Sequence, residues 1–277
     1  MHDLDRDSII RTLAAAGCVA AAEEADELLE VSRDHGDLRH MVTRRLTGEP
    51  LAWITGRTSF CGIQVFIDGG VYVPRWQSEP LARWAARVLP PTGRGVDLCT
   101  GTGALALVMR SHRPDALVVA TEVDPGAARC ARRNGVVVHL GSLDAPLPAT
   151  WASRVDVMVG VLPYVPDRAL HLLPRDVQRF EPRLALDGGP DGLALVRTVV
   201  RRSPRWVRPA GWLGLEVGGD QVDEVAALFE SEGYRTVEVL EDADGDPRAV
   251  CGRLTARGSA ADRPPTPPPG QVPGANE

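Results

Sequence analysis

The stretch Val96-Asp97-Leu98-Cys99-Thr100-Gly101-Thr102-Gly103-Ala104-Leu105-Ala106 decides the fold. An apolar run leads into a glycine-rich turn, and a segment of helical character follows at once. Gly101 permits a tight turn, Gly103 lets the backbone approach a ligand, and Ala106 allows close contact between helix and strand. This order is typical of a Rossmann-like strand–turn–helix unit that binds a nucleotide.

An acidic residue ends the next predicted strand. Glu122 follows the apolar residues 117–121, at the place where a carboxylate accepts hydrogen bonds from both hydroxyls of a ribose. Asp97 would stand near the pyrophosphate of a dinucleotide, whereas S-adenosylmethionine carries an ammonium and a sulfonium group. Asp97 therefore favours S-adenosylmethionine as the cofactor. Two structural interpretations stay open: Asp97 bonds the backbone of the turn, and Glu122 is a solvated strand end.

Strands and helices alternate from about residue 76 to 254. This alternation predicts a parallel sheet that helices cover on both faces. The loop at 242–247 is too short for a helical crossover, so the last two strands should pair antiparallel. The predicted fold is α/β, with a seven-stranded, mostly parallel sheet whose last strand is antiparallel. The predicted strands are 94–99, 117–122, 136–140, 154–160, 212–217, 235–240 and 248–254, and the predicted helices are 76–88, 103–111, 125–134, 191–202 and 220–231.

Three regions flank this domain, which spans 76–254. Residues 1–55 form a predicted small helical domain, because apolar residues recur there at helical spacing. Residues 56–75 form a predicted β-hairpin linker that turns at Gly69-Gly70. Residues 255–277 are rich in proline and are predicted to be a disordered tail. Three glycines are the predicted C-terminal stops of the first helices: Gly17, Gly36 and Gly48.

Composition and charge narrow the class of protein. The 277 residues carry a net charge of -6, which disfavours broad binding of nucleic acid, since such binding needs a basic surface. No apolar stretch is long enough to span a membrane, and the acidic start does not resemble a signal peptide. The five cysteines are scattered without a C-x-x-C pair, so we expect neither disulfides nor a metal site. We expect a cytoplasmic monomer.

Four further segments carry a family resemblance. On these segments the chain resembles the release-factor glutamine N5-methyltransferases of the HemK family, over nearly all of the chain before the tail. The resemblance implies a helical N-terminal domain that helps to bind a protein substrate, and S-adenosylmethionine as methyl donor. It implies as substrate the glutamine of the Gly-Gly-Gln loop of peptide-chain release factors. The segments are GEPLAWITG at 48–56, VPRWQSE at 73–79, FEPRLALDGGPDGL at 180–193 and LGLEVG at 213–218.

Two groups of candidate site residues follow from the turn, the acid and the resemblance. Ser142 replaces the family's acid that contacts the adenine amino group, and a hydroxyl can also accept there. Glu181 is expected to hold structure, pairing with an arginine, while Arg75 is either part of the site or a surface residue. The candidate cofactor-binding residues are Asp97, Thr100, Gly101, Thr102, Gly103, Glu122, Val123, Ser142 and Leu143, and the candidate catalytic residues are Val161, Leu162, Pro163 and Tyr164.

The catalytic segment departs from the Asn-Pro-Pro-Tyr signature of the family. In the family, the asparagine oxygen and the next carbonyl accept hydrogen bonds from the substrate NH2 and orient a poorly nucleophilic amide nitrogen. The Val161 side chain cannot accept a hydrogen bond, whereas the backbone carbonyl of Leu162 still can, and the Tyr164 ring can form a wall of the site. Without this acceptor, one N–H group of the substrate amide is desolvated and unpaired, which costs about 1–3 kcal/mol. Loss of such a contact in the transition state can lower the rate on the order of 100-fold.

Three hypotheses for function stay open at this point. The first is a protein glutamine N5-methyltransferase. The second is a methyltransferase that acts on a small molecule or on another side chain. The third is a catalytically impaired protein that binds S-adenosylmethionine and serves in interaction. Methylation of nucleic-acid bases, which uses the same signature, is disfavoured by the acidic charge and the lack of a recognition domain.

Overall fold

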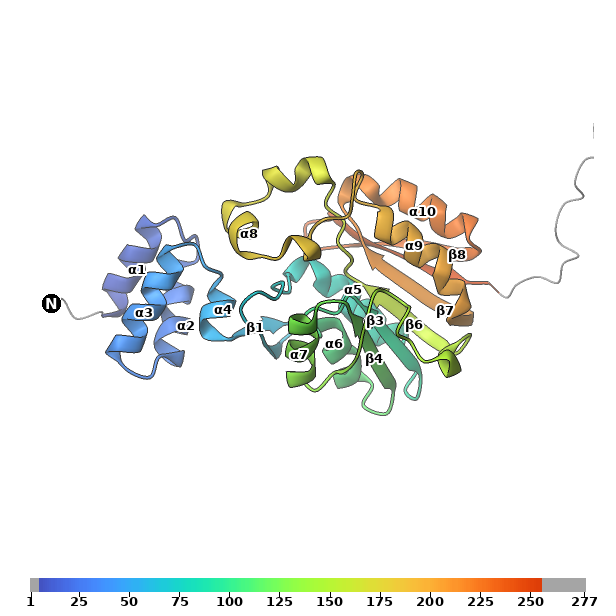
Figure 1. Ribbon diagram of the computed structural model, residues 1–277, viewed down its shortest axis with the longest axis horizontal. Helices are drawn as coiled ribbons and strands as arrows, with labels where there is room; N and C mark the ends of the chain where they lie inside the picture. Colours follow the sequence, from blue (N-terminus) through green and yellow to red (C-terminus); the bar gives the residue numbers. More distant parts are fainter. Residues whose placement is uncertain (1–4, 256–277) are drawn as a thin grey trace, which may run out of the picture.

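A seven-stranded sheet forms the centre of the larger part of the molecule. The computed structural model describes residues 5–255, and its strands lie in the order β5-β4-β3-β6-β7-β9-β8 (Figure 1). β9 pairs antiparallel with both β7 and β8, and the other neighbours pair parallel, which confirms the predicted fold class. The strands are β3 (Arg94–Leu98), β4 (Leu117–Glu122), β5 (Val137–Leu140), β6 (Val155–Gly160), β7 (Val207–Glu216), β8 (Tyr234–Glu241) and β9 (Pro247–Leu254).

Helices cover both faces of this sheet, because its central strands are apolar on both sides. One core joins α5, α6 and α7 to the sheet, and the other joins α9 and α10 to the opposite face. Trp84 lies in the first core and Phe229 in the second, and both are fully buried. The helices are α5 (Glu79–Val88), α6 (Ala104–His112), α7 (Pro125–Arg133), α9 (Ala194–Arg202) and α10 (Val222–Ser231).

The N-terminal part is helical, as predicted, but one of its predicted helix stops is wrong. Gly36 lies in the first turn of α3, after the N-cap Asp34, whose carboxylate accepts from the Gly36 and Asp37 amides at 2.8 Å. Gly17 and Gly48 do follow helices and adopt a positive φ. The helices are α1 (Arg6–Ala15), α2 (Ala21–Val31), α3 (His35–Leu46) and α4 (Leu51–Thr55).

The linker contains a hairpin, but its turn is not the predicted one. β1 (Arg57–Phe60) and β2 (Ile63–Phe66) meet at Cys61-Gly62, where φ is 50° and 76°. Two positive φ values are typical of the turn whose twist matches that of the paired strands. The expected turn at Gly69-Gly70 lies instead in a loop, and the 71–73 segment packs beside α7 without forming a strand.

Residues 161–193 connect β6 to α9, and the sequence predicted no helix or strand in this segment before residue 191. It holds η3 (Asp167–Leu172), α8 (Arg175–Phe180) and η4 (Arg183–Ala185). In Figure 1, α8 stands between the N-terminal helices and the sheet. The Arg179 guanidinium donates to the Thr47 carbonyl at 3.1 Å, and the Phe180 ring meets Trp53 edge-on at 6.3 Å. These contacts join the segment to the N-terminal helices.

Two further features complete the fold. Within residues 5–255, no helix is both long and apolar enough to cross a membrane. The tail predicted at 255–277 lies outside the described residues, apart from Thr255.

Candidate active site

A cavity of about 590 Å³ lies at the carboxyl-terminal edge of β3, β4 and β6, where the loops that follow these strands meet. Binding at this edge is the rule for open α/β sheets. Asp97 and Gly103 do not line the cavity, although both support the turn that does. The predicted residues that line it are Thr100, Gly101, Thr102, Glu122, Val123, Ser142, Leu143, Val161, Leu162, Pro163 and Tyr164.

Glu122 ties the glycine turn to the end of β4. Its side chain is 7% exposed, and Oε2 accepts from the Gly101 amide at 2.9 Å. Oε1 accepts from the amides of Val123 at 2.8 Å and Asp124 at 3.0 Å. A carboxylate offers about four acceptor positions, so capacity remains for a donor from the cavity. Glu122 is therefore a fixed acceptor at the cavity wall rather than a solvated strand end.

Asp97 stabilises the turn by hydrogen bonds, although it does not line the cavity itself. It is 1% exposed, and its Oδ2 atom accepts from the Thr100 hydroxyl at 2.5 Å and from the Ala106 amide at 3.2 Å. Burial, which penalises the ionised form, raises the pKa of Asp97 to about 7. A cation bound in front of the turn would favour the ionised carboxylate.

Glycine is required within the turn for two different reasons. Gly103 has a φ of 88°, and a Cβ there would lie 2.7 Å from Cγ2 of Val136, so the helix could not pack. Gly101 has a φ of 57°, and a Cβ there would meet nothing within 4 Å. The space in front of Gly101 is open to a ligand.

Three buried polar atoms on the cavity wall have no hydrogen-bond partner among the residues that the structure describes. They are Oε1 of Gln77, Oγ1 of Thr102 and Oε2 of Glu216. Buried polar groups are nearly always satisfied, so such atoms point to a ligand with donor groups. S-adenosylmethionine carries ribose hydroxyls, an ammonium and an adenine amino group. The acceptors at Gln77, Thr102 and Glu122 fit the donors of this cofactor, and Oε2 of Glu216 remains without an assigned donor.

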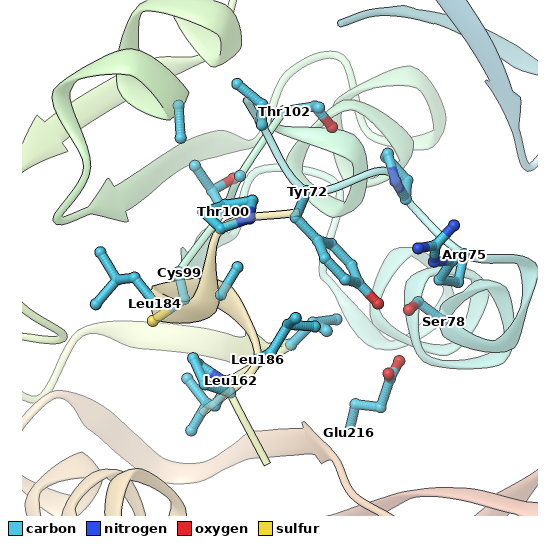
Figure 2. A pocket seen from close by; sticks show the side chains of 18 of the residues that line it. Tyr72, Arg75, Ser78, Cys99, Thr100, Thr102, Leu162, Leu184, Leu186 and Glu216 are labelled. Carbon is cyan, nitrogen blue, oxygen red and sulfur yellow. The ribbon is translucent and has the colours of Figure 1, made fainter. Parts of the chain in front are cut away.

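A polar cluster lies at one side of the cavity, and the sequence did not mark most of it. Tyr72, Arg75 and Ser78 gather there near Glu216, while Leu162 and other leucines form the opposite wall (Figure 2). Burial raises the pKa of Tyr72 to about 12, so its hydroxyl stays a neutral donor. The sequence signal that was available is a single acid in the apolar strand 213–217.

Arg75 belongs to this cluster and is not a surface residue. Its guanidinium forms an ion pair with Glu181, which confirms the expected structural pairing of that acid. It also lies over the Tyr72 ring, 5.3 Å from the centroid. The pair joins the end of the linker to the segment that follows α8, which places both at the cavity wall.

The candidate catalytic segment 161–164 lies against Gln221 and against the glycine-rich block that follows α8. The Tyr164 carbonyl accepts from Nε2 of Gln221 at 3.0 Å. A Cβ at Gly192 would lie 2.2 Å from the Tyr164 carbonyl oxygen, and one at Gly188 would lie 2.7 Å from the Pro163 carbonyl oxygen. Only glycine at positions 188 and 192 allows the backbone of this block to lie so close to the backbone of residues 163–164.

Comparisons with known proteins agree with this geometry. No family model matches the chain. The release factor glutamine methyltransferase of Geobacter sulfurreducens is 36% identical over 222 residues, which cover 78% of this chain and 77% of that protein. That of Mycolicibacterium smegmatis is 35% identical over 269 residues, covering 89% and 95%. The solved catalytic domain of hMettl16, bound to an RNA hairpin, superposes with a TM-score of 0.50 at 15% identity. It covers 70% of this chain and 77% of that one, and shows the fold alone.

The sheet order, the cavity at its carboxyl edge and the identity to curated relatives agree on one conclusion. The chain is an S-adenosylmethionine-dependent methyltransferase, and it belongs to the family of release factor glutamine methyltransferases.

Proposed function

We propose that this protein transfers the methyl group of S-adenosylmethionine to the side-chain amide nitrogen of a glutamine in a peptide-chain release factor. It acts as a monomer in the cytoplasm. The observation that carries the proposal is that one cavity is lined both by the Gly101–Glu122 pair and by residues 161–164. Curated relatives named for this reaction support the acceptor, and the alternative of a small-molecule acceptor is not favoured.

The cofactor half of the cavity consists of residues from three loops. Glu122 would hold the ribose hydroxyls, the turn at 100–103 the amino-acid portion, and Ser142 with Leu143 the adenine. Asp97 would favour the positive charge of the ammonium group through the turn. When bound, the cofactor supplies an electrophilic methyl group on a sulfonium.

The acceptor half must orient an amide nitrogen whose lone pair is delocalised. Leu162 is 1% exposed on the cavity wall, and its carbonyl is the acceptor that the chain retains from the family signature. The buried apolar side chains of Leu162 and Leu186 exclude water from this wall, so that each hydrogen bond to the substrate amide is stronger than in water. Positioning and desolvation are the two contributions that these residues make to the reaction.

Recognition of the protein substrate is assigned to the N-terminal helical domain, residues 1–55, together with α8. Val177 of α8 lines the cavity, while Arg179 and Phe180 of the same helix contact the N-terminal helices. A protein bound to those helices would therefore also meet the cavity mouth. This arrangement suits a substrate glutamine presented on a loop.

The test is methyl transfer to a purified release factor. The full chain is incubated with the release factor and isotope-labelled S-adenosylmethionine, and peptides are then analysed by mass spectrometry. We expect one labelled methyl group on the glutamine of the Gly-Gly-Gln peptide, and none when that glutamine is replaced by glutamate. A chain that binds the cofactor but leaves this glutamine unlabelled would overturn the proposal.

A further inference from the structure

Glu216 is a buried carboxylate at the acceptor end of the cavity. It ends β7, is 2% exposed and lines the cavity. Among residues 5–255, nothing donates a hydrogen bond to its Oε2 atom. A buried carboxylate oxygen without a donor is costly, because the desolvation of a charged group is not compensated. The missing donor is therefore expected to arrive with a ligand.

The register of the sheet places Glu216 beside the position where the family signature is broken. β6 and β7 pair Gly160 with Leu215, so the next residues along the two strands, Val161 and Glu216, are neighbours at the sheet edge. Val161 packs against the core that contains α5, and Ser78, the residue before α5, lies near Glu216 (Figure 2). The carboxylate therefore lies on the same face of the sheet as the Val161 side chain.

We propose that Glu216 accepts a hydrogen bond from the substrate glutamine NH2 and then takes its proton during methyl transfer. The inference rests on the proposed function, and it gives Glu216 the acceptor role that Val161 cannot fill. The amide nitrogen bonds to the methyl carbon, the carbon–sulfur bond breaks with its electron pair left on sulfur, and one N–H proton passes to Oε2. The products are an N-methyl amide, S-adenosylhomocysteine and a neutral Glu216 carboxyl group, which releases its proton to water.

The surroundings of Glu216 suit a proton acceptor. Burial raises its pKa, which makes the carboxylate more basic than one at the surface. The Ser78 and Tyr164 hydroxyls and the Arg248 guanidinium act in the opposite direction and favour the ionised form. Tyr72 also faces Glu216, and Arg75 lies beside Tyr72.

Two variants and one control separate this role from a purely structural one. Glu216→Leu removes both acceptor oxygens and replaces the carboxylate by an apolar side chain of similar size. Glu216→Gln keeps one acceptor oxygen but no base. The control is Glu238→Gln on β8, whose carboxylate accepts from Nε1 of Trp84 at 2.6 Å and does not line the cavity.

The readouts are kcat and KM with the release factor, and the Kd for S-adenosylmethionine by calorimetry. For Glu216→Leu we expect kcat to fall roughly 100-fold, a smaller fall for Glu216→Gln, and no change in either variant's cofactor Kd. Glu238→Gln should match the wild type. The wild-type kcat should also fall on acidification at a pH above the usual glutamate range, and this limb should vanish in Glu216→Leu.

A rescue experiment completes the test. Val161→Asn adds an amide acceptor next to the missing carboxylate, so it should restore part of the kcat lost in Glu216→Leu. Wild-type kcat in a folded Glu216→Leu protein would overturn the inference, as would an unchanged pH profile in Glu216→Gln if the leucine variant does not fold. A wild-type enzyme that binds the cofactor but leaves the release factor unmethylated would instead overturn the proposed function, and this inference with it.

Discussion

Replacing Glu122 by glutamine should weaken the cofactor site without removing its shape. The carboxylate accepts three backbone amides, one on Oε2 and two on Oε1. Glutamine has one acceptor oxygen, so if that oxygen keeps the Val123 and Asp124 amides, its NH2 group faces the Gly101 amide. One hydrogen bond to a charged group is lost, at about 1.5–3 kcal/mol. We expect Glu122→Gln to lower the free energy of unfolding by about this amount.

The same substitution should lower cofactor affinity. The group that faces the cavity loses its charge and one acceptor, and an energy of about 1.5–3 kcal/mol corresponds to roughly a 10- to 100-fold increase in Kd. Calorimetry with S-adenosylmethionine measures the Kd, and urea unfolding measures stability, with Glu238→Gln as the matched control. A folded Glu122→Gln protein that binds the cofactor as tightly as the wild type would refute this account of Glu122.

Three more substitutions probe other parts of the site. Val161→Asn adds the amide acceptor of the family signature, so kcat for glutamine methylation should rise in a labelled-methyl assay; an unchanged kcat would show that this position does not limit the reaction. Gly103→Ala should melt well below Gly101→Ala in thermal unfolding, because only its Cβ would strike Val136; equal melting temperatures would contradict this. The raised pKa of Asp97, about 7, means that its contribution to stability is present at low pH and is lost as pH rises through 7. Asp97→Asn should remove that loss in melts between pH 4 and 8, and an identical pH dependence in both proteins would contradict the assignment.

The juxtaposition of the glycine turn and Glu122 could be predicted because its determinants are local in sequence. A glycine turn leaves few conformations open, and an acid at the end of the next parallel strand must lie beside it. Gly101 and Glu122 are indeed joined by a hydrogen bond at 2.9 Å. The short loop at 242–247 likewise predicted that the last strand pairs antiparallel, as β8 and β9 do.

The acceptor half could not be predicted, because it depends on contacts between distant segments. Arg75 and Glu181 form an ion pair although they are 106 residues apart in the sequence, and nothing in either segment alone indicates which arginine pairs with which acid. Helix α8 has only six residues and lies between Pro174 and Pro182, so it is too short for a periodic pattern to identify. The hairpin turn was predicted wrongly for a local reason, because Cys61-Gly62 is a weaker turn signal by composition than Gly69-Gly70.

The most direct test of the account is a crystal structure of the protein with S-adenosylhomocysteine. We expect the ligand in the cavity at the edge of β3 and β4, with its ribose hydroxyls on Glu122 and its sulfur directed towards Leu162 and Glu216. A ligand bound elsewhere, or one whose sulfur faces away from residues 161–164, would contradict the central claim that this cavity presents a methyl group to an amide.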